Sequence, residues 1–118
     1  MKDLAALKAR YQRDPLPVQL GGLASNLARA AWCMRRPGSR SQLAPIFRES
    51  KYFAEWAAGA AQPDVQVTLA EVQVELAVWE RRVSHDGLSS AEAEQSEAWA
   101  AKLLSLAGLT GGAAERTH

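Results

Sequence analysis

Residues 65–83 of the chain read VQVTLAEVQVELAVWERRV, and this stretch decides the fold class. Large apolar side chains recur in it in alternating steps of four and three, at Val65, Leu69, Val72, Leu76, Trp79 and Val83. That spacing is typical of one face of an α-helix. A strand is the alternative, because apolar residues also alternate within 65–69 and 72–78. The alternation changes from odd to even positions at residues 70–71, however, whereas the helical spacing keeps its phase throughout. The stretch therefore predicts a helix.

Three further valines, Val67, Val74 and Val78, lie outside that stripe and widen the apolar surface of the predicted helix. A second apolar edge suits a helix that is contacted on two sides. One way to contact it twice is a homodimer in which this helix packs across a two-fold axis. We therefore expect these valines to belong to an interaction surface.

Two helices are predicted before this stretch on the N-terminal side. A short one covers residues 2–13 and ends before Pro15 and Pro17, because proline withholds a backbone donor and restricts the residue before it. A long one follows from Pro17 to Met34. The pair Gly21-Gly22 lies inside it, either at a tight helix crossing where only glycine fits or at a notch for a partner. The apolar stripe of the long helix consists of Leu20, Leu23, Leu27, Ala30 and Met34.

Two more helices complete the predicted set. Residues 35–41 read as a loop, after which a helix starts near Ser39 or Ser41, accepts Pro45 in its first turn and reaches Ala57. Within it, Ser50, Phe53 and Ala57 should share the buried face. A turn at residues 85–87 precedes the last helix, which begins with a capping box of Ser89 and Glu92, runs over residues 90–107 and stops at Gly108. We expect its inward residues to be Trp99, Leu103 and Leu106.

The expected fold class is all-α, an antiparallel helical bundle of four long helices plus a short N-terminal helix. A length of 118 residues fits one domain, here residues 1–109, with residues 110–118 as a mobile tail. By default we expect the four tryptophans, Trp32, Trp56, Trp79 and Trp99, to form an aromatic core layer; the alternative is that one or two of them lie at an interface, where the indole N–H finds a partner. No stretch is apolar for long enough to cross a membrane and no signal-peptide core follows Met1, so the expected location is the cytoplasm.

Catalytic and cofactor chemistry finds little support in the residue types. The chain has one cysteine, Cys33, and two histidines, His85 and His118, which are too few for a thiolate zinc cage. Ser84-His85-Asp86 cannot form a catalytic triad, because neighbours in sequence do not reach the relay geometry. The sequence contains no metalloprotease, P-loop or dinucleotide motif. We therefore expect no enzyme activity, no metal and no cofactor, and we expect Cys33 to fill the core.

The charges are unevenly distributed although the net charge is only +1. Residues 29–51 carry six basic side chains against Glu49, whereas residues 62–118 carry nine acidic side chains against four basic ones. One interpretation is neutralisation between the two halves or by an acidic protein partner. The other is a nucleic-acid-binding module in the basic segment 29–51. A pI near 7.9 favours the first interpretation.

Three short strings resemble those of small all-helical cyanobacterial proteins of unassigned function. They are LPVQLGGLASNLAR at residues 16–29, ESKYFAEW at 49–56 and VELAVW at 74–79, and the likeness spans roughly residues 10–108. The resemblance implies a cyanobacterial cytosol and says nothing about activity.

The sequence as a whole predicts a non-enzymatic protein-protein interaction or adaptor domain that forms a homodimer. A nucleic-acid-binding module using the basic segment is the alternative. The candidate interaction surface consists of Arg35, Arg36, Arg40, Arg48, Lys51, Val67, Val74 and Val78. We expect neither a small-molecule cofactor nor a membrane as partner.

Overall fold

The computed structural model of the chain describes residues 3–83 and 88–108, and all regular structure within these ranges is helical. The α-helices are α1 (Leu4–Arg13), α2 (Leu16–Met34), α3 (Leu43–Ala58), α4 (Pro63–Val83) and α5 (Ser90–Ala107), and a 3-10 helix η1 (Pro37–Gln42) joins α2 to α3. The all-α prediction is confirmed for the described residues. The predicted turn at residues 85–87 and the tail 110–118 lie outside them.

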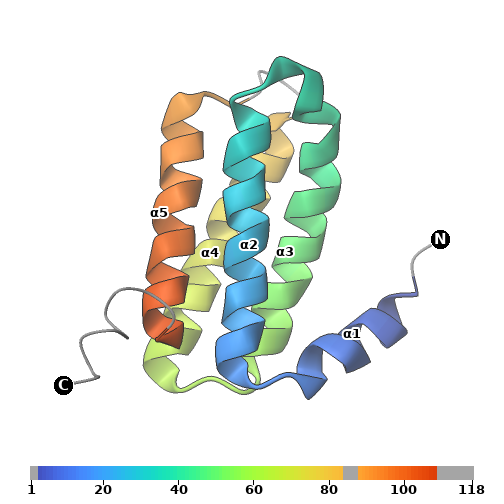
Figure 1. Cartoon of the computed structure of the whole chain (residues 1–118), viewed down its shortest axis with the longest axis vertical. Coiled ribbons are helices and arrows are strands. Elements are labelled where there is room, and N and C mark those ends of the chain that lie inside the picture. Colours follow the sequence, from blue (N-terminus) through green and yellow to red (C-terminus); the bar gives the residue numbers. More distant parts are fainter. Residues whose placement is uncertain (1–2, 84–87, 109–118) are drawn as a thin grey trace.

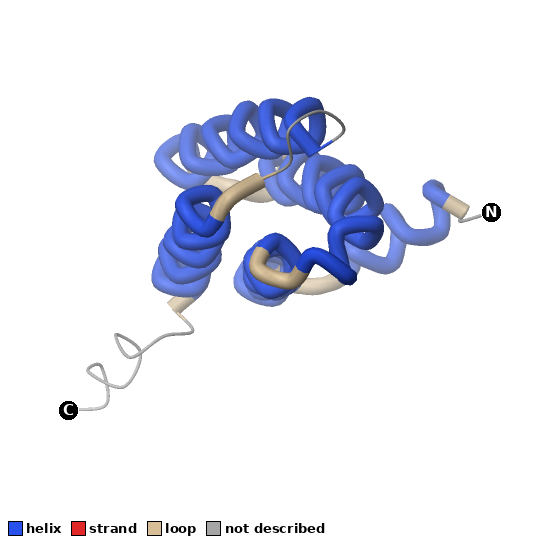
Figure 2. The backbone as a smooth tube through the Cα atoms, turned by 90° about the horizontal axis from the view of Figure 1, so that it is seen from above, coloured by secondary structure: helices blue, strands red, loops and turns tan. Residues whose placement is uncertain are grey.

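Four long helices surround one apolar interior, with α2 in front between α5 and α3 (Figure 1). Seen from above, α2 and α5 are viewed nearly end on, whereas α4 runs across the view at the back (Figure 2). Helix α1 projects away from the long helices at the N-terminal side (Figure 1). The face of α4 that points away from α2 and α3 is therefore free of other described helices.

The helix ends follow from local capping. The Asp3 side chain accepts the Ala6 N–H at 3.1 Å and begins α1, while the proline-bearing segment after Arg13 ends it. The predicted capping box of Ser89 and Glu92 is present at the start of α5, and Gly108 ends α5 in the left-handed conformation at φ 76°. These boundaries agree with those predicted from the sequence.

The connection between α2 and α3 differs from the prediction. Residues 37–42 form a 3-10 helix rather than a loop, because Pro37 fixes its first turn. Helix α3 begins at Leu43, two residues after Ser41, and its N-cap residue Gln42 makes no side-chain cap. Pro45 does lie in the first turn of α3, where the missing N–H costs nothing.

The core contains the apolar stripes that the sequence predicts. In α4 the stripe residues from Val65 to Trp79 are at most 9% exposed, and in α2 Leu23 and Leu27 are fully buried. Cys33 is also fully buried, as predicted. Phe47 and Trp79 meet across α3 and α4 with ring centroids 6.0 Å apart. Tyr11 of α1 stacks on Phe53 at 4.1 Å and thereby attaches α1 to the core.

Two predicted core residues are exposed. Trp32 is 50% exposed and Leu106 is 39% exposed, so the aromatic layer includes Trp56 and Trp79 but not Trp32. Trp32 lies one residue before Cys33 and two before Met34, both buried, and so it points away from the buried stripe of α2. The prediction of an inward Trp32 and an inward Leu106 was wrong.

Gly22 of α2 is not required by a close contact with another helix. A Cβ atom added there would lie 3.7 Å from the Tyr11 ring, which is ordinary van der Waals contact. The interpretation that only glycine fits is therefore wrong for Gly22. The backbone flexibility of Gly22 should lower the stability of α2 by up to about 1 kcal/mol relative to alanine.

Candidate interaction surfaces

One side of α4 carries several exposed apolar side chains. Val67, Val74 and Val78 are 60%, 67% and 45% exposed, and their spacings of seven and four place them on one side of the helix. Ala70, Glu71 and Ala77 lie between them and are also exposed. We call this set of six residues the α4 valine face. All three valines of the predicted surface lie on it.

The α4 valine face has a physical origin in the sequence pattern. The apolar residues of the buried stripe, such as Leu69, Val72 and Leu76, are at most 1% exposed and face the core. The second set of valines is out of phase with that stripe, so the same helix cannot bury both sets in one core. An exposed valine gains nothing for the stability of a monomer. A contact with another molecule would bury it.

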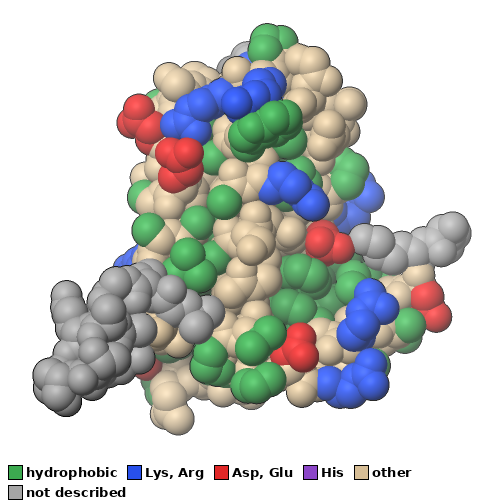
Figure 3. Space-filling view, viewed as in Figure 1, with side chains coloured by type: hydrophobic (Ala, Val, Ile, Leu, Met, Phe, Trp, Pro, Cys, Tyr) green, Lys and Arg blue, Asp and Glu red, His purple; other side chains and the backbone are tan. Residues whose placement is uncertain are grey.

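The basic residues of the predicted surface do not lie together. Arg35, Arg36 and Arg40 are at the junction of α2 and η1, whereas Arg48 and Lys51 are on α3. Figure 3 shows basic side chains at the upper end of α2, with acidic side chains next to them over the upper part of α5. The segment 29–51 therefore supplies two separate basic sites.

Ion pairs across the helices neutralise part of this basic segment. Arg35 donates to both carboxylate oxygens of Glu97 on α5, at 2.7 and 3.1 Å. The hydrogen bond between the two side chains raises the pKa of Arg35 and lowers the pKa of Glu97. Lys51 on α3 forms an ion pair with Glu80 on α4. Contacts of this kind match the expected neutralisation between the two halves of the chain.

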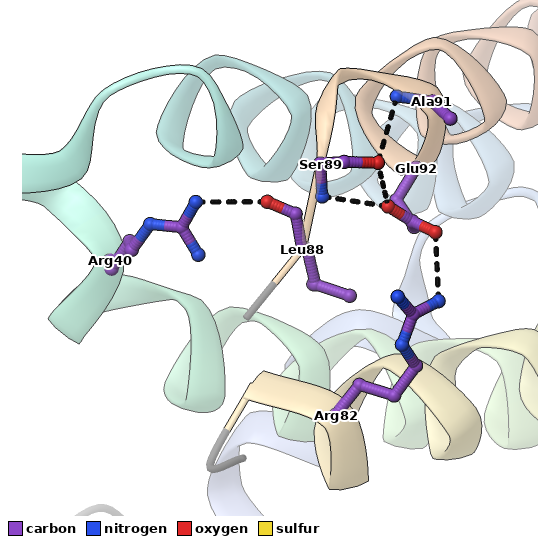
Figure 4. Close-up of polar contacts among 6 residues, drawn as sticks. All are labelled: Arg40, Arg82, Leu88, Ser89, Ala91 and Glu92. Atoms are coloured by element: carbon purple, nitrogen blue, oxygen red, sulfur yellow. Dashed lines mark hydrogen bonds and ion pairs between the residues drawn. The ribbon is translucent and has the colours of Figure 1, made fainter. Parts of the chain in front are cut away.

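Arg40 belongs to a polar cluster at the start of α5 (Figure 4). Its Nη2 donates to the Leu88 carbonyl at 2.9 Å, while Arg82 Nη1 donates to Glu92 at 2.8 Å. Glu92 also accepts the Ser89 backbone N–H at 2.7 Å and the Ser89 hydroxyl. The hydrogen bonds from Ser89, with a smaller effect of Arg82, lower the pKa of Glu92 to about 2. The cluster holds α4, α5 and η1 in place, and its role is structural.

Trp32 and Arg36 form an exposed pair that sequence reasoning missed. The Arg36 guanidinium lies 3.9 Å from the centroid of the Trp32 ring, and its Nη1 donates to the Trp32 carbonyl at 3.0 Å. This is a cation–π contact on the surface. The signal for it was available, because Trp32 is out of phase with the buried stripe of α2 and is flanked on the same face by Ala28 and Arg29.

A shallow hollow of about 440 Å³ lies between α3 and α4. It brings together the predicted residues Arg48 and Lys51. Its full lining is Arg48, Lys51, Tyr52, Glu55, Gln73 and Glu80. Two cations and two carboxylates line it in equal number, so it offers no net field to an anion. Ligand pockets are lined mostly by apolar side chains with a few polar groups, whereas charged and polar side chains and one tyrosine line this hollow.

The described part of the chain contains no group of side chains suited to metal binding. Within residues 3–83 and 88–108, no three His, Cys, Asp or Glu side chains are grouped so as to hold a metal ion. Cys33 is fully buried, with its Sγ 3.9 Å from the Gln42 side-chain oxygen. His85 lies outside the described residues.

Among the described helices, none combines the length and the apolar character needed to cross a membrane. No protein-family model matches the chain, and no curated protein and no solved structure matches it either.

Proposed function

We propose that this chain is a non-enzymatic protein-interaction domain that forms a homodimer through the α4 valine face. The observation that carries the proposal is the exposure of Val67, Val74 and Val78 on one side of a helix whose other side is core. Exposed apolar residues scattered singly are ordinary, but a row of them along one helix marks an interaction site. The occupant we assign to this face is a second copy of the chain.

A second copy suits this face because the face is complementary to itself. In a two-fold interface the same patch serves both partners, so bulky residues must meet small ones of the same set. The α4 valine face supplies three valines and two alanines along a helix about 30 Å long. Valines of one copy can therefore lie against alanines of the other, and two helix backbones can approach closely.

The expected affinity is low. Burying the exposed part of each valine contributes about 1.5 kcal/mol, so the valines of both copies together contribute about 9 kcal/mol. Association costs at least about 4 kcal/mol. The remaining ~5 kcal/mol corresponds to a dissociation constant of about 200 µM. Such a dimer forms and dissociates readily.

The rest of the molecule acts in this proposal as a scaffold. The four long helices form an antiparallel bundle, with α1 as a short additional helix attached through Tyr11. The working location is the cytoplasm, and the sequence resemblance suggests a cyanobacterial one. No catalytic step and no cofactor belong to the proposed function.

Nucleic-acid binding by the basic segment is the second candidate. It has less support, because Arg35 and Lys51 are already in ion pairs and the five predicted basic residues are divided between two places. The Trp32–Arg36 pair is the observation in its favour, since aromatic and arginine side chains stack on bases. Binding of a labelled single-stranded oligonucleotide that weakens steeply with salt would support it.

The test of the homodimer is sedimentation velocity from 1 to 300 µM. We expect the weight-average sedimentation coefficient of the wild type to rise with concentration, and Val74→Glu to abolish the rise. Val18→Glu is the matched control, because Val18 is 51% exposed on α2 and lies outside the α4 valine face. Equal melting temperatures would show that both variants remain folded. A wild type that stays monomeric at 300 µM would overturn the proposal.

A further inference from the structure

The α4 valine face also contains one charged side chain, the exposed carboxylate of Glu71, and a two-fold dimer would bring two copies of it together. We infer that the second copy lies antiparallel, centred between Glu71 and Val74, so that the Glu71 carboxylates of both copies come together beside the two-fold axis and limit the affinity. The inference rests on the proposed function, because it concerns the same face. It assigns Glu71 the role of setting the strength of self-association.

The charges at the two ends of α4 favour the antiparallel orientation. Asp64 lies in the first turn, and Arg81 lies in the last turn beside Arg82, whose charge is already paired with Glu92. A parallel pair would bring each end beside its own like charges, whereas an antiparallel pair brings the acidic start of one helix beside the basic end of the other. The helix dipoles act in the same sense, since their positive and negative ends also meet in an antiparallel pair.

The spacing of valine and alanine defines the register. When the two helices are centred between Glu71 and Val74, Val67 of one copy lies opposite Ala77 and Val78 of the second copy. Val74 then lies opposite Ala70 and Glu71 of the second copy. Every valine on the face finds an apolar neighbour in this arrangement. A shift by one helical turn would leave a valine at each end without one, so this register buries the most apolar surface.

Glu71 lies within the row of valines rather than at its end. It comes four residues after Val67, three before Val74 and seven before Val78, so all four side chains share one side of the helix. A two-fold axis perpendicular to both helices maps each edge of the face onto the same edge of its copy. The two Glu71 side chains therefore lie on the same edge near the centre. Two carboxylates brought together in this way repel each other.

The experiment compares three samples with the wild type: Glu71→Gln, Glu71→Lys, and an equal mixture of wild type and Glu71→Lys. Self-association is measured by sedimentation equilibrium. Association within the mixture is measured by fluorescence with one of the two components labelled. We expect Glu71→Gln to associate about three- to tenfold more tightly than the wild type. Glu71→Lys alone should remain about as weak as the wild type, because two lysines also repel. The mixture should associate at least about threefold more tightly than either component, because unlike charges then face each other.

Glu94→Gln is the matched control, because Glu94 is an exposed carboxylate on α5 whose field acts on Arg35 of α2. It should leave the association unchanged. If the wild type associates but Glu71→Gln and the mixture are no tighter, the antiparallel register is wrong and the proposed homodimer stands. If neither the wild type nor any variant associates at 300 µM, the proposed function itself is overturned. If Glu71→Gln associates more tightly than the wild type but the mixture associates no more tightly than its two components, the two-fold arrangement is also overturned.

Discussion

Phe53→Ala is the substitution whose effect follows most directly from the packing. Phe53 is 9% exposed on α3 and stacks on Tyr11 with ring centroids 4.1 Å apart and planes 10° from parallel. Trp56 lies 6.1 Å from it in a tilted arrangement. Tyr11 is the one residue of α1 that is buried, and Phe53 is the side chain that stacks on it, with Trp56 5.9 Å away on the same helix.

The expected cost of Phe53→Ala is about 3–4 kcal/mol. Truncating a buried phenylalanine typically costs about 3–5 kcal/mol, of which a stacked aromatic partner accounts for about 0.5–1.5 kcal/mol. The lower part of the range applies because the site is at the edge of the core, where α1 can shift and water can enter. For a domain of this size the melting temperature should fall by about 10–15 °C.

The assays are urea unfolding and native-state hydrogen exchange, with Phe47→Ala as the comparison. Phe47 is fully buried and contacts Trp79, away from α1. We expect both variants to lose stability, but only Phe53→Ala should release the amides of α1 to exchange faster than global unfolding allows. A Phe53→Ala protein as stable as the wild type would show that the Phe53 ring does not contribute to the core, and one in which α1 keeps its protection would show that Phe53 does not attach α1.

Four smaller effects follow from particular residues. Gly22→Ala should raise the stability by about 0.5–1 kcal/mol in thermal melts, because its Cβ fits 3.7 Å from Tyr11; a lower melting temperature would contradict this. Ser89→Ala should cost about 1 kcal/mol through loss of the capping box. The pKa of Glu92 is lowered from 4.5 to about 2 in the folded state. The stability that this carboxylate provides is therefore present above pH 4.5 and disappears as the pH falls towards 2. In unfolding experiments at several pH values, Ser89→Ala should lose less stability on acidification than the wild type. Lys51→Ala should change the melting temperature little, since its ion pair is partly exposed, and a fall above about 5 °C would contradict that.

The sequence predicts helix positions well where spacing and capping agree. The stripe in α4 and the capping box of Ser89 with Glu92 both depend on residues close together in the chain, and both are present. The start of α3 was predicted less well. Ser39 and Ser41 looked like caps, yet the segment closes into a 3-10 helix whose geometry depends on Pro37 and on packing against α2.

The candidate surfaces were only partly predictable. The second row of valines was visible as a set out of phase with the core stripe, and Val67, Val74 and Val78 are exposed. Trp32 was assigned to the core because tryptophan is large and apolar, although its phase in α2 contradicted this. The division of the basic residues into two places depends on how helices far apart in sequence pack, as in the pair Arg35 and Glu97, and short-range patterns do not contain that information.

Self-association through the α4 valine face can be followed residue by residue in ¹⁵N–¹H correlation spectra recorded during dilution from 500 to 10 µM. We expect concentration-dependent shifts that gather on α4 around Val67, Val74 and Val78. The amides around Val18, an equally exposed valine on α2, should not shift. Spectra that do not change on dilution would contradict self-association, and shifts that gather around α1 or Trp32 instead of α4 would contradict the use of the α4 valine face.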